Sequence, residues 1–249
     1  MIPDINFDDD ITSNGFIAVK ENGQENRSIC LINDAGIYPR NPSSIFFLKK
    51  EAHFMKKVSV TEILPNDQYS EQRAEARKKI ISIKKDRSIN LGPLLRIVFE
   101  NHDTVLFQIQ EMLMVEGISD PKKVQEEIDT YNDLLPSPNE LSAVLFIEIT
   151  SEDKVRETLD KLRGIDRQPS IHLVFPSGKI SAIFESDRSE DSKMSSVHYI
   201  RFPLGKTGAS FLKNMREDEK AFLLADHPAY SAMVQLPLPL LSSLRSDLD

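Results

Sequence analysis

The stretch Ser142–Thr150, SAVLFIEIT, consists almost entirely of apolar and β-branched side chains. A run of this length and composition is typical of a strand buried inside a sheet, and it is too short to cross a bilayer as a helix. Helical periods dominate the chain before it, and strand patterns dominate after it. An α+β fold is therefore expected.

The front half of the body carries helix start and stop signals. Ser70 is suited to cap a helix whose first turns contain acidic residues and whose last turn is basic, as the helix dipole favours. Asn101 is a second candidate cap, and Pro121 is a favourable first residue for a third helix. The expected elements are helices over residues 70–87, 101–117 and 121–131 and a strand over residues 94–100.

The second half alternates apolar and polar residues over short segments. Ser177-Gly178 is a turn signal between two such segments, and Asp226-His227-Pro228 is another. The expected strands are Ser142–Thr150, Ser170–Pro176, Lys179–Glu185, Ser195–Leu204, Ala221–Ala225 and Ala229–Leu236, with short helices near residues 152–162, 209–215 and the C-terminus. We expect a single α+β domain whose helical front half packs on a mainly antiparallel sheet.

Residues 1–54 differ from the body, residues 55–249. They contain short apolar runs, scattered Gly and Pro, and no sustained helical period. Met55 opens MKKVSVTEILP, which is typical of a fresh N-terminus, and the preceding Lys50-Glu51-Ala52 can be encoded by a ribosome-binding sequence. Our hypothesis is that translation starts at Met55 in the native host. The alternative is an accessory β-hairpin or a tail that docks on the domain.

Charge and composition exclude several classes. The 31 basic and 39 acidic side chains give a net charge of −8, which disfavours a general binder of nucleic acids or anionic membranes. The single cysteine, Cys30, excludes a disulfide framework and an iron–sulfur ligand set within the chain. No transmembrane run and no signal-peptide pattern is present in the sequence, so a cytoplasmic location is expected.

Common catalytic motifs are missing. Gly205-Lys206-Thr207 lacks the upstream glycine of a phosphate-binding loop. The chain has no Gly-x-Ser-x-Gly elbow, and none of its 5 histidines follows a Glu at the spacing of a di-iron site.

A divalent metal site is one interpretation of the remaining polar residues. His198 lies in an expected strand, Asp226 and His227 lie at a turn, and Glu111 lies on a helix, so they could supply His and carboxylate ligands. The structural alternative is a sheet histidine at His198 and turn chemistry at Asp226 and His227. Glu148, inside a buried strand, is expected to pair with a basic side chain such as Arg201.

The expected first helix is strongly basic. Residues 55–87 carry 9 basic and 5 acidic side chains, a net charge of +4. Arg77, Lys78 and Lys84 could dock an acidic partner, or they could belong to a solvated helix face. Aromatic residues do not interleave with these charges, which disfavours single-stranded nucleic acid.

Six ordered segments of the body resemble one family. They are ARKKIISIKKDRSINLGPLLRIVFEN, VLFQIQEML, YNDLLP with ELSAVLFIEI, SSVHYIRF and DHPAY. Together they resemble the uncharacterised bacterial family catalogued as domain of unknown function 3501, and residues 1–54 fall outside the resemblance. The segments most characteristic of the family map to Gln108, Gln110, Glu111, His198, Arg201, Asp226, His227 and Tyr230.

The resemblance implies a redox context rather than an activity. Genes of this family often stand beside genes for rubrerythrin-like and iron–sulfur proteins. We therefore expect a non-enzymatic accessory protein that binds such a redox partner in oxidative-stress defence. The alternative is a metal-dependent enzyme or metal sensor that uses His198, His227 and Asp226, with Glu111 as a further ligand or base.

Overall fold

The structure is a computed structural model that describes residues 55–150, 152–185, 195–216 and 218–248, together with the backbone of two N-terminal strands. The chain divides into two compact units, Met1–Ser43 and Ser44–Asp249. In the first unit, β1 (Phe16–Glu21) and β2 (Gln24–Leu31) pair as an antiparallel hairpin. All further description concerns the second unit.

Three helices form one layer of this unit: α1 (Asn66–Lys85), α2 (His102–Val115) and α3 (Pro121–Asn132). The short 3-10 helix η1 (Val60–Glu62) precedes them and contacts α3. The expected cap of α2 is confirmed, because the Asn101 side chain accepts from the N–H of Thr104. Helix α3 begins at Pro121 as expected, and the Asp120 side chain before it accepts from the first turn of the helix. The expected start of α1 at Ser70 is wrong, because the helix begins earlier, directly after Pro65.

Helix α2 packs against both α1 and α3. Its polar residues Gln108 and Glu111, which fall outside the apolar stripe, are therefore buried as well. A helix with neighbours on two sides buries more than one face, and its polar residues must then find partners inside the protein.

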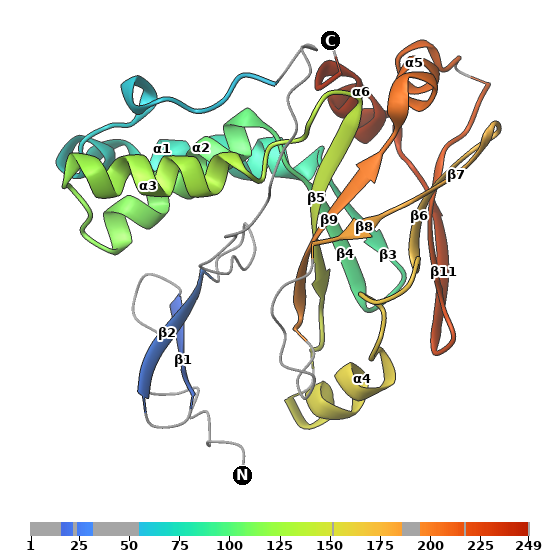
Figure 1. Ribbon diagram of the computed structural model, residues 1–249, viewed down its shortest axis with the longest axis horizontal. Helices are drawn as coiled ribbons and strands as arrows, with labels where there is room; N and C mark the ends of the chain where they lie inside the picture. The colour runs from blue at the N-terminus through green and yellow to red at the C-terminus, as the bar shows by residue number, and fades with distance from the viewer. Residues whose placement is uncertain are drawn as a thin grey trace. The chain divides into compact units, whose positions relative to one another are not determined.

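The remaining described strands form two antiparallel sheets (Figure 1). The five-stranded sheet has the order β3 (Ser88–Leu91), β4 (Leu95–Phe99), β5 (Glu140–Ile147), β9 (Val197–Pro203) and β8 (Ile183–Phe184). The four-stranded sheet has the order β11 (Tyr230–Gln235), β10 (Phe222–His227), β6 (Ile171–Phe175) and β7 (Gly178–Ser181). The α+β class is confirmed.

The expected hairpin around Ser177-Gly178 is confirmed as β6 and β7, but its second strand does not stay in one sheet. After the buried residue Ala182, the chain crosses over, and β8 pairs with β9 of the other sheet.

Strand β3 was not expected, because the helical pattern of α1 continues into the basic residues before it. It pairs with β4 as a short hairpin through Gly92.

One hydrophobic core fills the space between the two sheets. Its centre is made by fully buried residues of facing strands, including Ile97 and Leu145 on one sheet and Leu173 and Leu223 on the other. Helices α5 (Gly205–Asn214) and α6 (Leu238–Ser246) add Leu212 and other apolar residues to this core.

Helix α4 (Val155–Lys161) follows η2 (Glu152–Lys154) between β5 and β6. No helix in the described part of the chain is long and apolar enough to span a bilayer.

Candidate functional site

A groove opens between α1 and α2. It has a volume of about 160 Å³, and most of its lining is apolar. From α1 it receives Ala76, Ile80 and Ile83, each about one turn from the next, and from α2 it receives Leu106 and Phe107. Leu64, which follows η1, completes the apolar lining. A cavity of this size accommodates a single aromatic or branched side chain.

Charged side chains border this groove. Lys79 of α1 reaches toward Asp103 of α2, with Nζ and Oδ1 3.5 Å apart and both side chains largely exposed. Glu62 bonds the Lys56 ammonium at 2.9 Å and lies 3.1 Å from His102 Nε2. The hydrogen bond from Lys56 is the main cause that lowers the pKa of Glu62 to about 2. The groove thus combines an apolar floor with a rim that carries acidic and basic side chains.

Glu111, a candidate metal ligand, is occupied inside the helical layer. Its carboxylate accepts from Tyr69 Oη at 2.7 Å and from two nitrogens of Arg73 at 2.9 Å each. Burial is the largest cause that raises the pKa of Tyr69, and the adjacent Glu111 carboxylate raises it further. Glu111 therefore serves to join α1 to α2.

The two glutamines of the same segment also bond within the fold. Gln110 donates to the Leu64 carbonyl and accepts from the Leu64 N–H, both at 2.8 Å, so it fixes the segment that borders the groove. Gln108 donates to Glu100 at 2.9 Å and to the Thr104 carbonyl at 3.1 Å. Gln110 thus joins the middle of α2 to the segment after η1, and Gln108 bonds to the first turn of α2 and to the residue that precedes its cap.

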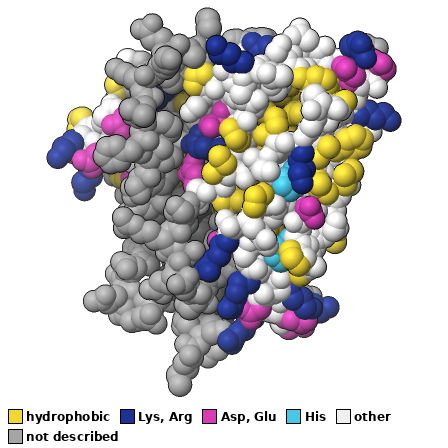
Figure 2. Space-filling model, turned by 45° about the vertical axis from the view of Figure 1, so that its right-hand side comes forward, with side chains coloured by type: hydrophobic (Ala, Val, Ile, Leu, Met, Phe, Trp, Pro, Cys, Tyr) yellow, Lys and Arg dark blue, Asp and Glu magenta, His cyan; other side chains and the backbone are white. Residues whose placement is uncertain are grey.

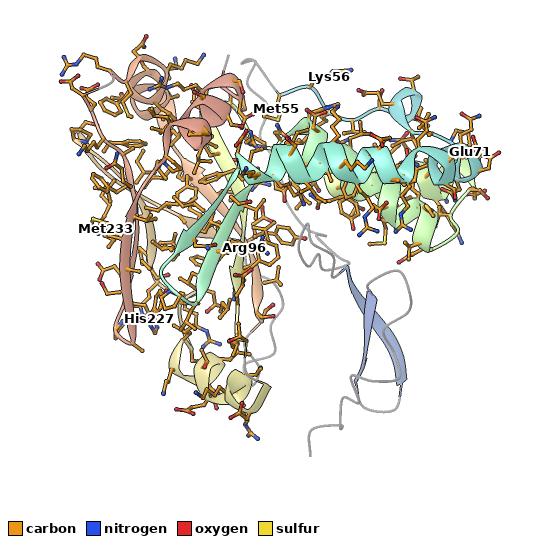
Figure 3. The ribbon with its side chains drawn as sticks, turned by 180° about the vertical axis from the view of Figure 1, so that it is seen from behind. Met55, Lys56, Glu71, Arg96, His227 and Met233 are labelled. Atoms are coloured by element: carbon orange, nitrogen blue, oxygen red, sulfur yellow. The ribbon has the colours of Figure 1, made fainter. Side chains whose placement is uncertain are left out.

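The proposed metal-ligand histidines lie in separate surroundings. His198 in β9 donates from Nε2 to the Ser195 carbonyl at 2.9 Å and packs edge-on against Phe184. Nδ1 of His227 accepts from the Ala229 N–H at 3.2 Å, a bond within the β10–β11 turn (Figure 3). Asp226 beside it is exposed. In the described part of the chain, no three or more His, Cys, Asp or Glu side chains form a group that could hold a metal ion.

Glu148 pairs with a basic side chain, as expected, but the partner is Arg96 and not Arg201. Glu148 pairs with Arg96, its Oε1 2.5 Å from Arg96 Nε. Glu148 directly follows β5, and it comes close to Arg96 because Arg96 faces Phe146, two residues before Glu148. Arg201 instead pairs with Glu140 at 2.8 Å and with Glu185 at 2.5 Å. It also donates to the carbonyls of Asp133 and Leu135, so it ties the end of α3 to β9.

Tyr230 is another family-characteristic residue with a structural contact. Its hydroxyl donates to the Leu91 carbonyl at 2.6 Å and accepts from the Leu94 N–H at 3.2 Å. These bonds join β11 of one sheet to the β3–β4 turn of the other. Gly92 in that turn has a φ of 72°, and a Cβ there would stand 2.3 Å from the Tyr230 hydroxyl oxygen.

The basic residues of α1 divide into exposed and buried ones. Lys78 is exposed and pairs with Glu75 at 2.7 Å, and Arg77 is half-buried. Lys84 is only 4% exposed, so its ammonium is not presented to a docking protein. Burial lowers the pKa of Lys84 to about 8, with a smaller lowering by Arg96 and an opposing effect of Glu100.

The sequence did not predict the buried polar cluster around Arg87, close to Lys84 in the chain. Arg87 donates to the carbonyls of Phe99 and Glu100 at 2.9 Å each, and it pairs with Asp247 at 2.5 Å. It thereby connects the end of α1, the end of β4 and the C-terminal helix. The only sequence signal was a basic residue at the end of a helix, which equally fits a solvated helix end.

Comparison with known proteins identifies a family and a similar crystal structure. The family model described as protein of unknown function (DUF3501) matches residues 57–248. A crystal structure of a novel protein of unknown function from Burkholderia pseudomallei K96243 is 31% identical, with a TM-score of 0.71, and covers 78% of this chain and 100% of that chain. No curated protein matches the chain. The family model confirms the resemblance of the six sequence segments, and the chain therefore belongs to the DUF3501 family of proteins of unknown function.

Proposed function

We propose that this protein is a non-enzymatic accessory protein that binds a redox partner, either a rubrerythrin-like or an iron–sulfur protein. One observation carries the proposal: several polar residues most characteristic of the family are bonded inside the fold. Glu111, Arg201 and Tyr230 each bond two or more groups from other segments. Side chains used in this way stabilise a scaffold, which is what a binding protein requires.

The groove between α1 and α2 is the surface that we assign to the partner. Its floor of Ala76, Ile83 and Leu106 is partly exposed, and an apolar side chain of the partner would lose its hydration there. Lys79 and Asp103 at the rim would exchange their long, exposed ion pair for charges of the partner. The redox character of the partner rests on the family's gene neighbourhood.

Two neighbouring lysines provide a matched test of this assignment. Lys78 and Lys79 are almost equally exposed, at 74% and 72%, but only Lys79 lines the groove. The full chain and each single variant, Lys78→Glu and Lys79→Glu, would be used to pull down the purified rubrerythrin-like and iron–sulfur proteins of the native host. We expect Lys79→Glu to weaken capture at low salt and Lys78→Glu to leave it unchanged.

A second variant tests the apolar part of the same surface. Leu106→Gln keeps the size of the side chain but puts a polar group on the floor of the groove, so capture should weaken at high salt as well. Thermal unfolding of the variant verifies that the fold is intact. If neither candidate partner binds the wild-type chain, the proposed function is wrong; if a partner binds but all variants bind it as the wild type does, the assignment of the groove is wrong.

A further inference from the structure

Strand β11 forms one border of the four-stranded sheet. Among the described residues it pairs only with β10, in an unbroken antiparallel register from Phe222 opposite Gln235 to His227 opposite Tyr230. Figure 3 labels Met233 on this outermost strand. The border of the sheet is therefore regular over all six residues of β11.

The hydrogen bonds of β10 decide which groups of β11 face outward. The Asp226 N–H donates to the Ser170 carbonyl at 2.7 Å, on the β6 side of β10, and the Leu236 N–H donates to the Ala221 carbonyl at 2.8 Å, across the β10–β11 pair. In an antiparallel strand, the N–H and C=O of one residue point to the same neighbour, and successive residues alternate. Ser231, Met233 and Gln235 consequently present their backbone donors and acceptors away from the sheet.

This border lacks the features that prevent strands from pairing between molecules. The sequence of β11, YSAMVQ, contains no charge, no proline and no glycine. The other border strands of the two larger sheets are shorter: β3 and β7 have four residues each, β7 with a glycine and a lysine, and β8 has two. A border strand that is short or charged is less able to pair with a strand of another molecule, and β11 is neither short nor charged.

The side chains of β11 are complementary to a second copy of the same strand. If two β11 strands pair antiparallel around Met233, Met233 lies opposite Met233 of the second copy, and Ser231 lies opposite Gln235 of the second copy. The backbone groups of all three residues point outward, so the Met233–Met233 pair and the two Ser231–Gln235 pairs each exchange two hydrogen bonds. The pairs are apolar or neutral, and no like charges oppose each other.

The exposed surface around β11 agrees with this register. Met233 is 58% exposed at the centre of the strand, and Leu224 lies beside it on the outer face of the sheet. Figure 2 shows the molecule from this side, with hydrophobic side chains spread over its described part. The inner face of β11 is covered instead, because Tyr230 and Ala232 pack on the β3–β4 turn. A second copy would thus bury Met233 without disturbing the core.

We propose that this protein forms a symmetric dimer in which the β11 strands of two copies pair antiparallel around Met233. The two four-stranded sheets then become one continuous sheet. A two-fold contact of this kind is self-complementary, so it closes after two copies and does not extend into a fibre.

The test measures the mass of the full chain in solution over a series of concentrations, by light scattering and by native mass spectrometry. Met233→Lys places two like charges opposite each other in the dimer. Met233→Pro removes an outward N–H together with the methionine side chain, and it leaves the bonds from β11 to β10 in place. Ile183→Lys is the control, because Ile183 on the border strand β8 has the same exposed fraction as Met233, 58%.

We expect the wild type and Ile183→Lys to be dimers with the same dissociation constant, and both Met233 variants to raise that constant at least about tenfold. In hydrogen exchange, the amides of Met233 and Gln235 should become protected as the concentration rises. The proposal is overturned if the wild type stays monomeric, if the Met233 variants dimerise as the wild type does, or if a dimer forms without protection of these amides. Thermal unfolding verifies that each variant is folded.

Discussion

At the scale of single residues, histidine illustrates how position determines chemical behaviour. His172 lies on the outer face of the four-stranded sheet, yet its ring is buried, and Nδ1 lies 3.0 Å from Ser181 Oγ. Burial lowers the pKa of His172, Lys179 lowers it further, and Asp226 opposes the effect. The neutral ring is therefore the form that fits the fold.

The lowered pKa of His172 predicts how stability depends on pH. Between the lowered pKa in the folded protein and the usual value of about 6.5, the unfolded chain binds more protons than the folded one. The free energy of unfolding should therefore fall as the pH is lowered below about 6.5. Urea unfolding of the wild type and of His172→Gln at pH 7 and pH 5 measures this effect, and the variant should lose less stability than the wild type on acidification.

A control for this pH effect lies on the same strand. Val174→Ala also alters the outer face of β6 but introduces no titrating group. It should lower stability by the same amount at both pH values. Equal pH dependence in the wild type and in His172→Gln would show that His172 does not titrate in this range.

At the scale of elements, a buried ion pair joins the first two helices. The Glu111 side chain is 1% exposed and the Arg73 side chain 14%, and Tyr69 adds a third group to the same carboxylate. Packing of apolar faces brings α1 and α2 together, but these bonds fix how the helices are rotated and shifted against each other. The floor of the groove depends on that register.

We predict that Glu111→Gln destabilises the protein by about 3 kcal/mol, because it leaves the Arg73 guanidinium buried without a full counter-charge. Chemical denaturation measures the change. Glu75→Gln is the control: it removes the carboxylate of an exposed pair with Lys78 on the same helix and should cause no measurable change. A loss at Glu111 as small as that at Glu75 would contradict the structural role of Glu111.

At the scale of the whole molecule, a few polar bonds connect parts that the core alone does not align. Arg87 ties α1 and β4 to the C-terminal helix, Arg201 ties the end of α3 to β9, and Tyr230 ties the two sheets together at one edge. Each of these bonds joins residues that are far apart in the sequence. They are the contacts by which the helical layer and the two sheets keep a fixed arrangement.

We predict that Tyr230→Phe lowers the free energy of unfolding by about 1–2 kcal/mol. The variant keeps the ring but leaves the Leu91 carbonyl and the Leu94 N–H without the hydroxyl that bonds both. Thermal and urea unfolding measure the loss. Ser231→Ala, at the exposed neighbouring position, is the control and should unfold as the wild type does. An unchanged stability of Tyr230→Phe would mean that the sheets do not depend on this contact.

The sequence identified most elements of this fold because their signals are local. Asn101 caps α2, Pro121 opens α3, and Ser177-Gly178 turns a hairpin, each through bonds or backbone angles within a few residues. It also predicted the family, since the six segments are ordered strings of residues. The sequence did not predict β3, because the basic residues at the end of α1 continue the helical pattern almost up to this short strand.

Only the tertiary structure decided what the polar residues do. Glu111, Lys84 and Arg201 have side chains that would serve equally well in a binding surface, a metal site or a buried network. The oppositely charged side chains beside them, Arg73, Glu100 and Glu185, belong to other segments of the chain, and neither helical nor strand periodicity specifies which segments meet. The sequence by itself therefore determined the elements and the class of fold, through local hydrogen bonding and hydrophobic patterning. The packing of the helical layer and the two sheets determined which charges are buried, which groove stays open and which strand is left at the border.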